Sequence, residues 1–173
     1  MLFPFENFHP DVPESVFVAP TAVIIGRTHI GEGSSIWFHT VVRADINRID
    51  IGMNTNIQDG CLLHVTNKHG LFVGDRVTVG HGAILHGCRV EADCLISMGA
   101  VVLDGAVVGA GSIIAAGAVV APGSQIPAGS LAMGVPAKVV RQVTDDDRHK
   151  IDRGWQNYLH YSGIYRGMTL KVE

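Results

Sequence analysis

The chain has little charge, little cysteine and few aromatic residues. Charged residues make up only 17% of its 173 positions and aromatic residues 6%, and the formal net charge is −3. Because no cluster of Lys and Arg is present, we expect neither a nucleic acid nor an anionic membrane as a partner. The three cysteines have no CxxC spacing, which argues against a disulfide framework and against a cysteine zinc motif. We expect buried, reduced thiols and a small-molecule substrate.

Targeting and membrane signals are weak in this sequence. Residues 1–15 lack a basic region followed by an apolar core, so we expect no signal peptide and, by default, a cytoplasmic location. The uncharged stretch 105–137 is long enough for a membrane helix. Its prolines and repeated glycines, however, are unsuited to a continuous apolar helix. We therefore expect no membrane span.

The dominant feature of the sequence is a repeat of six residues. A period of six fits neither a helix nor a plain strand, but it fits a coil with three short sides. Each side is then a short β-segment with one aliphatic residue pointing inward, and small residues turn the corners. Eighteen aliphatic positions follow this pattern in four blocks: Val18, Ile24, Ile30, Ile36 and Val42; Ile51, Ile57 and Leu63; Val73, Val79 and Leu85; Val90, Ile96, Val102, Val108, Ile114, Val120 and Ile126.

Three sides per turn predict about six coils, stacked as parallel strands roughly 4.8 Å apart. The hexad resembles that of the left-handed β-helix family over about residues 12–140. Left-handedness is implied by this resemblance alone, since parallel crossovers are otherwise almost always right-handed. We thus predict an all-β solenoid, a left-handed parallel β-helix over 12–140, with an N-terminal extension over 1–11.

A helix is predicted after the solenoid, within residues 144–162, and a tail over 163–173. Thr144 and Asp147 have the spacing of a capping box, which places the first helical turn at about Asp145. The helix should end near Tyr161. Its apolar members fall at helical spacing and are expected to pack along one side of the coil: Ile151, Trp155, Tyr158 and Leu159.

The hexad register places several polar residues relative to one another. If Ile51, Ile57 and Leu63 define sides A, B and C of one coil, the residue after each of them points outward. On that basis Arg43, His64 and His86 form one outward ladder on side C of successive coils. Gln58 follows the inward residue of side B, and Asp59 and His81 occupy equivalent places near the next corner.

His64 and His86 on neighbouring coils are close enough to hold one metal ion. Two histidines make a weak site, because zinc takes three or four protein ligands. His81 is not on their side of the coil, so a third ligand must come from another subunit. The sequence therefore predicts an oligomer with metal sites between subunits, and a homotrimer would give three equivalent sites.

The motifs around these histidines resemble those of the gamma-class carbonic anhydrases. They are the run Arg43-Ala-Asp45, the run from Asn56 to Asp59, His64 after the inward Leu63, and the segment 80–87 with its two histidines. The resemblance implies that His64 and His86 of one subunit and His81 of its neighbour bind Zn²⁺, with Fe²⁺ or Co²⁺ as alternatives.

The same resemblance implies reversible hydration of CO₂ to bicarbonate by metal-bound hydroxide, and roles for four further residues. Gln58 would hydrogen-bond the metal water, and Arg43, Asp45 and Asp59 would form structural ion pairs across the interface.

The chain also departs from the best-known active members of the family. It lacks their long acidic loop with a glutamate proton shuttle, and Ile46 stands where they have a second glutamate. Tyr158 and His69 are candidates to transfer the proton in place of the shuttle glutamate. Three alternatives remain open at this stage: a hexapeptide acyltransferase, a metal-dependent thioesterase and a non-catalytic trimeric scaffold held together by its metal.

Overall fold

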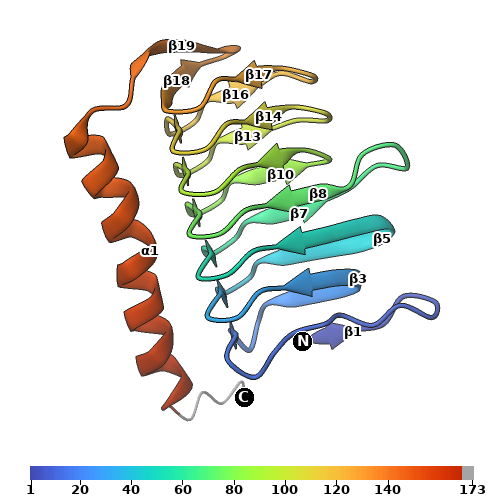
Figure 1. Cartoon of the computed structure of the whole chain (residues 1–173). Coiled ribbons are helices and arrows are strands. Elements are labelled where there is room, and N and C mark those ends of the chain that lie inside the picture. Colours follow the sequence, from blue (N-terminus) through green and yellow to red (C-terminus); the bar gives the residue numbers. More distant parts are fainter. Residues whose placement is uncertain (169–173) are drawn as a thin grey trace.

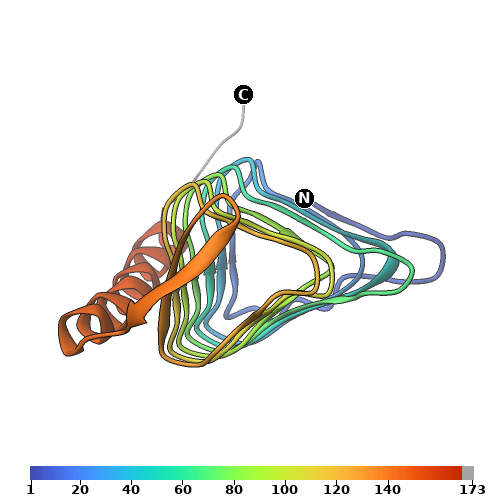
Figure 2. The same ribbon diagram turned by 90° about the horizontal axis from the view of Figure 1, so that it is seen from above.

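The structure is a computed structural model that describes residues 1–168. It is a parallel β-solenoid with a single helix, α1, lying along its side (Figure 1). Viewed along its axis the coil has three sides and encloses a core, and α1 covers one of these sides (Figure 2). Among the described residues no helix is both long and apolar enough to cross a bilayer.

Side B forms a sheet of its own, which α1 covers. Its eight strands comprise seven parallel ones and the antiparallel β19, so the solenoid has one coil more than the six expected. The strands are β2 (Phe17–Val18), β4 (Ser35–Ile36), β6 (Asn56–Ile57), β9 (Thr78–Val79), β12 (Leu95–Ile96), β15 (Ile113–Ile114), β18 (Ser130–Gly134) and β19 (Ala137–Gln142).

Sides C and A belong to one sheet of eleven strands, because the two longest strands run around the corner between these sides. Those two are β3 (Val23–Ile30) and β5 (Val41–Ile51). Side C continues through β7 (Leu62–His64), β10 (Ile84–His86), β13 (Val101–Val102) and β16 (Val119–Val120), and side A through β8 (Leu71–Val73), β11 (Arg89–Val90), β14 (Val107–Val108) and β17 (Gln125–Ile126).

The hexad register expected from the sequence is confirmed. Ile51 pairs with Val73 on side A, Ile57 with Val79 on side B, and Leu63 with Leu85 on side C. Of the eighteen aliphatic positions, all but the partly buried Val18 are buried. The insertions between the blocks of hexads therefore bulge at corners and leave the stacking register intact.

Small residues at the corners are required by the close stacking of the coils. A Cβ atom added to Gly52 would lie 2.6 Å from the carbonyl carbon of Gly74 in the next coil, and one on Gly74 would lie 2.6 Å from the amide nitrogen of Ala92. These distances are below any van der Waals contact. The corner between sides A and B thus accepts only glycine at these two levels.

The three cysteines occupy inward positions two residues before a hexad residue, where the coil has room only for a small side chain. All three are free and buried. Burial raises the pKa of each thiol to about 12, so the thiols stay protonated near neutral pH. This agrees with the expectation of reduced, buried thiols.

Helix α1 spans Asp145–Arg166 and begins with the expected capping box. Thr144 accepts a hydrogen bond from the Asp147 amide, and the Asp147 carboxylate accepts one from the Thr144 amide. The Arg141 guanidinium, which pairs with Asp147, holds the pKa of that carboxyl well below its usual range. The first turn of α1 is therefore fixed both by the hydrogen bonds of the capping box and by the ion pair between Arg141 and Asp147.

The helix differs from the prediction at its far end and in one packing residue. It continues past residue 162 to Arg166, because Tyr165 packs against the rings of Phe17 and Trp37 on side B. Leu159, expected in the packed face, is 39% exposed. Residues 169–173 of the predicted tail lie outside the described residues.

The N-terminal extension is partly structured as well. Strand β1 (Leu2–Phe3) pairs in parallel with β3 and so adds an edge to side C at the first coil. Residues 1–11 are thus attached to the solenoid rather than separate from it.

Replacing Ile114 with Asp tests the inward register far from the histidines. Ile114 is fully buried, so an unpaired charge there should lower the free energy of unfolding by more than about 4 kcal/mol. Urea unfolding followed by circular dichroism measures this change. Gln125→Asp, at an exposed position of side A, should change it by less than about 0.5 kcal/mol. A soluble Ile114→Asp protein with the wild-type unfolding midpoint would contradict the register.

Candidate metal centre

The predicted ladder on side C is present. His64 of β7 pairs with His86 of β10 in the next coil, and Arg43 of β5 pairs with His64 from the coil before. Nδ1 of His64 lies 3.1 Å from Nε2 of His86, and the two ring centroids are 5.1 Å apart. Two ring nitrogens on one face of the coil therefore converge on a common point.

A carboxylate holds the other nitrogen of each histidine. Nε2 of His64 lies 3.0 Å from Oδ1 of Asp45, and Nδ1 of His86 lies 2.5 Å from Oδ1 of Asp104. Burial alone would raise the pKa of Asp45, but hydrogen bonds from Arg43 and His64 outweigh it and lower that pKa. Carboxylates in this position orient histidine ligands and raise their basicity.

Asp104 was not identified from the sequence, although the hexad register contains the signal. Val102 stacks on Leu85, so counting one residue on from each places Leu103 over His86, and counting two places Asp104 over Gly87. A carboxylate one coil above and one residue beyond the histidine is within its reach. The register places the backbone, but it does not say toward which neighbour the side chain turns.

His81 lies apart from the ladder, at the corner between sides B and C, as predicted. Its Nδ1 lies 2.9 Å from Oδ2 of Asp59, and its backbone N–H donates to Oε1 of Gln58 at 3.2 Å. The Tyr158 hydroxyl of α1 lies 3.4 Å from Nε2 of His81. Because Asp59 occupies one ring nitrogen, the other is the one that can bind a metal.

Gln58 and Tyr158, the two residues expected to take part in catalysis, are thus both beside His81. Gln58 is 6% exposed, and its Nε2 donates to Oδ1 of Asn56 at 3.1 Å, so its amide is fixed in orientation. Burial, followed by the charge of Asp59, raises the pKa of Tyr158. The phenol therefore stays protonated near neutral pH and can donate a hydrogen bond.

The charged residues expected at the interface find partners within the chain. Arg43 pairs with Asp45, and Asp59 with His81. These contacts hold side chains of the ladder and of the corner in place. Whether the same residues also pair across an interface remains a prediction.

Residues 1–168 of a single chain contain no group of three or more His, Cys, Asp and Glu side chains that could hold a metal. His64 and His86 come together, whereas His81 points from another corner. The three histidines therefore do not meet within the described part of one chain, and a site shared between subunits stays a prediction.

The two converging nitrogens fit a zinc ion. Ligands at about 2.0–2.1 Å from a tetrahedral zinc lie about 3.3 Å apart, close to the 3.1 Å between the nitrogens of His64 and His86. The flanking carboxylates supply the outer hydrogen bonds that such ligands need. Iron or cobalt would accept the same imidazole ligands.

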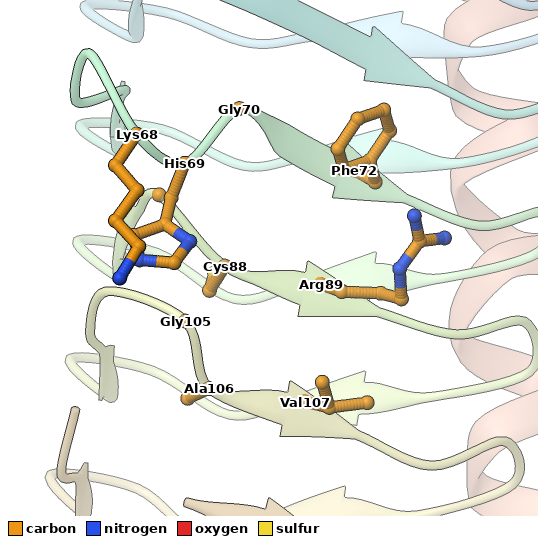
Figure 3. Close-up of a pocket in the computed structure, with 10 residues that line it drawn as sticks. Lys68, His69, Gly70, Phe72, Cys88, Arg89, Gly105, Ala106 and Val107 are labelled. Carbon is orange, nitrogen blue, oxygen red and sulfur yellow. The ribbon is translucent and has the colours of Figure 1, made fainter. Parts of the chain in front are cut away.

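The surface beside the ladder is apolar. Val41, Leu62 and Ile84 line a hollow together with the two histidines and Arg43. His69, the other candidate for a proton shuttle, lies elsewhere: it lines a separate hollow toward side A, beside Lys68 (Figure 3).

Comparison with known proteins supports both the repeat and the resemblance to the gamma carbonic anhydrases. The family model "Bacterial transferase hexapeptide (six repeats)" matches residues 87–122. Gamma carbonic anhydrase 2 of Arabidopsis thaliana mitochondria is 46% identical over 94% of this chain, which spans 60% of the plant protein's length. A carbonic anhydrase of Geobacillus kaustophilus is 44% identical over 97% of this chain and 92% of its own length.

A solved structure from Bacillus cereus, of a protein assigned provisionally as an acetyltransferase, superposes with a TM-score of 0.96. It is 41% identical and covers 98% of both chains. The fold is therefore shared over the whole length of these proteins. Identity of 44% across almost all of the Geobacillus carbonic anhydrase, together with the match to the plant gamma carbonic anhydrase, shows that this chain belongs to the gamma carbonic anhydrase family.

Proposed function

We propose that the protein hydrates CO₂ reversibly to bicarbonate at zinc ions shared between the subunits of a homotrimer. The observation that carries this proposal is the His64–His86 pair, whose free nitrogens converge while Asp45 and Asp104 hold the others. His81 of a neighbouring subunit would supply the third ligand. A cytoplasmic location remains a prediction.

The outer face of side C supports the trimer. Aliphatic residues form an outward ladder next to the histidines along successive coils, and Leu62 among them is 47% exposed. A continuous apolar face of this kind usually contacts a partner. Of the two sides that α1 leaves uncovered, side C carries this apolar ladder, whereas the corresponding positions of side A include Asp50 and Arg89. This aliphatic ladder, which runs beside the histidine ladder, comprises Val23, Val41, Leu62, Ile84, Val101 and Val119.

A zinc ion held by three neutral histidines would act as a Lewis acid. It would lower the pKa of water to about 7 and so provide hydroxide at neutral pH. The protein's own residues then position the reactants. Asp59 and Asp104 fix the tautomers of His81 and His86. The immobilised amide of Gln58 is placed to orient the nucleophile, and Leu62 and Ile84 favour an uncharged gas over water.

Proton release is the step for which the chain offers least. The raised pKa of Tyr158 makes it a hydrogen-bond donor rather than a proton acceptor at neutral pH. We therefore assign Tyr158 the role of donating a hydrogen bond beside His81, and we expect external buffer to carry the proton away.

An acyltransferase is the second candidate, because the Bacillus cereus structure of the same fold is assigned that activity. A transferase of this fold needs one histidine as a general base. The paired histidines with flanking carboxylates have no function in such a mechanism, and this observation favours the metal-dependent reaction.

Stopped-flow CO₂ hydration, with zinc content measured on the same sample, tests the proposed activity. We expect about one zinc per subunit and a rate that increases with imidazole buffer. His86→Ala should lose zinc and hydration together, whereas His29→Ala, a surface histidine paired with Asp11, should keep both. Zinc without hydration would overturn the proposal in favour of thioester hydrolysis or a structural ion. Activity that persists in His86→Ala would overturn the metal site.

Asp104→Asn tests the outer contact of the ladder. Asparagine is nearly isosteric but lacks the charge that holds Nδ1 of His86, so zinc affinity should fall about 10- to 100-fold. Competition with a chromogenic chelator measures this affinity. Asp50→Asn, which removes a carboxylate paired with Arg48 on side A, is the matched control and should leave it unchanged. Equal affinities in the two variants would contradict the role of Asp104.

A further inference from the structure

A second hollow lies away from the histidine ladder, between the corner loop that precedes β8 and the face of side A (Figure 3). Lys68 and His69 of this loop form one end, and Phe72 and Arg89 form the other. Glycines line it at successive levels of the stack: Gly70, Gly87 and Gly105. A Cβ atom added to Gly105 would lie 3.3 Å from Cε1 of His69, so the His69 ring covers part of this floor.

The hollow is cationic. Within residues 1–168 neither Lys68 nor Arg89 forms an ion pair with a carboxylate, and no Asp or Glu lines the hollow. Some other arginines are paired with a carboxylate: Arg48 pairs with Asp50 at 3.1 Å and Arg76 with Asp93 at 2.7 Å. Lys68 and Arg89 thus place two cations around a concavity that no carboxylate lines.

Arg89 is also held in place. Its Cζ atom lies 4.5 Å from the centroid of the Phe72 ring, against which the Arg48 guanidinium also packs at 4.9 Å. Stacking on an aromatic ring restricts the guanidinium but leaves its N–H groups free to donate. Such a fork matches the paired oxygens of a carboxylate or phosphate.

One carboxylate beside the glycines of the hollow is already engaged. The Asp104 carboxylate approaches Gly87, where an added Cβ would lie 3.0 Å from its Oδ1. The same oxygen lies 2.5 Å from Nδ1 of His86, on side C of the coil. Asp104 is thus directed to the ladder and does not pair with Lys68 or Arg89.

We infer that this hollow binds a small oxyanion, with the Arg89 fork at one end and the Lys68 ammonium at the other. Bicarbonate, a short carboxylate and inorganic phosphate share the required chemistry. Arg89 projects from side A and the histidine ladder from side C, whereas Gly87 and Gly105 of the hollow directly follow His86 and Asp104.

Titration of [¹⁵N]glycine-labelled protein tests the inference, since the amides of Gly70 and Gly105 report on the hollow itself. We use inorganic phosphate and bicarbonate in separate arms, each against sodium chloride at equal ionic strength. Both amides should shift with saturation in at least one arm and stay unshifted in chloride. The anion that binds more tightly, phosphate or bicarbonate, is the better candidate for the ligand of the hollow.

Three variants distinguish a specific anion-binding site from non-specific attraction by the positive charges of the surface. Arg89→Gln and Lys68→Gln should each weaken binding about tenfold, the effect of one charge-assisted hydrogen bond. Arg27→Gln is the matched control: its guanidinium stacks on Phe8 at 3.7 Å, outside the hollow, and its loss should not alter binding. Thermal unfolding checks that each variant is folded.

Arg89→Lys keeps the charge but removes the fork, and it should bind with intermediate affinity. No saturable shift of Gly70 and Gly105 in either arm would overturn the inference. Equal weakening by Arg27→Gln and Arg89→Gln would overturn it as well, because it would show non-specific attraction. The titrations use His86→Ala protein, so that neither result depends on zinc or on hydration activity.

Discussion

The stacking of one coil on the next, at about 4.8 Å, is the constraint on which the rest of the structure depends. Backbone hydrogen bonds between coils are satisfied only in register, and each side buries one aliphatic residue per coil. Register then decides which polar residues meet. Because side chains alternate along a strand, a slip by one residue at β10 would turn His86 inward and bring Leu85 to the surface, which would remove the pair with His64.

The solenoid also explains why the three histidines of one chain do not converge. Side chains on one face of a coil can stack into a ladder, but those of adjacent faces diverge, as His81 does from His86. A three-sided coil thus brings two of these histidines together, and in the proposed function the third ligand comes from a neighbouring subunit. The interior aliphatic positions stabilise the fold, while the residues of the proposed site all point outward.

Much of this arrangement could be predicted from the sequence, because the hexad fixes backbone pairing. The stacking of His64 on His86, the outlying position of His81 and the capping box at Thr144 all followed from spacing. What the period does not specify is the direction of a side chain or the packing between elements. For that reason the contact of Asp104 with His86 was missed, and so was the extension of α1 to Arg166, which depends on aromatic packing against side B.

The central claim is that each metal site is built by two subunits, and mixed trimers test it most directly. His64→Ala and His81→Ala protomers each lack one ligand at every site. Co-refolded at equal amounts, they should form intact interfaces wherever the ladder of one meets His81 of the other, which restores zinc to about one quarter of the sites. Zinc binding no higher than in either parent alone would contradict the shared site.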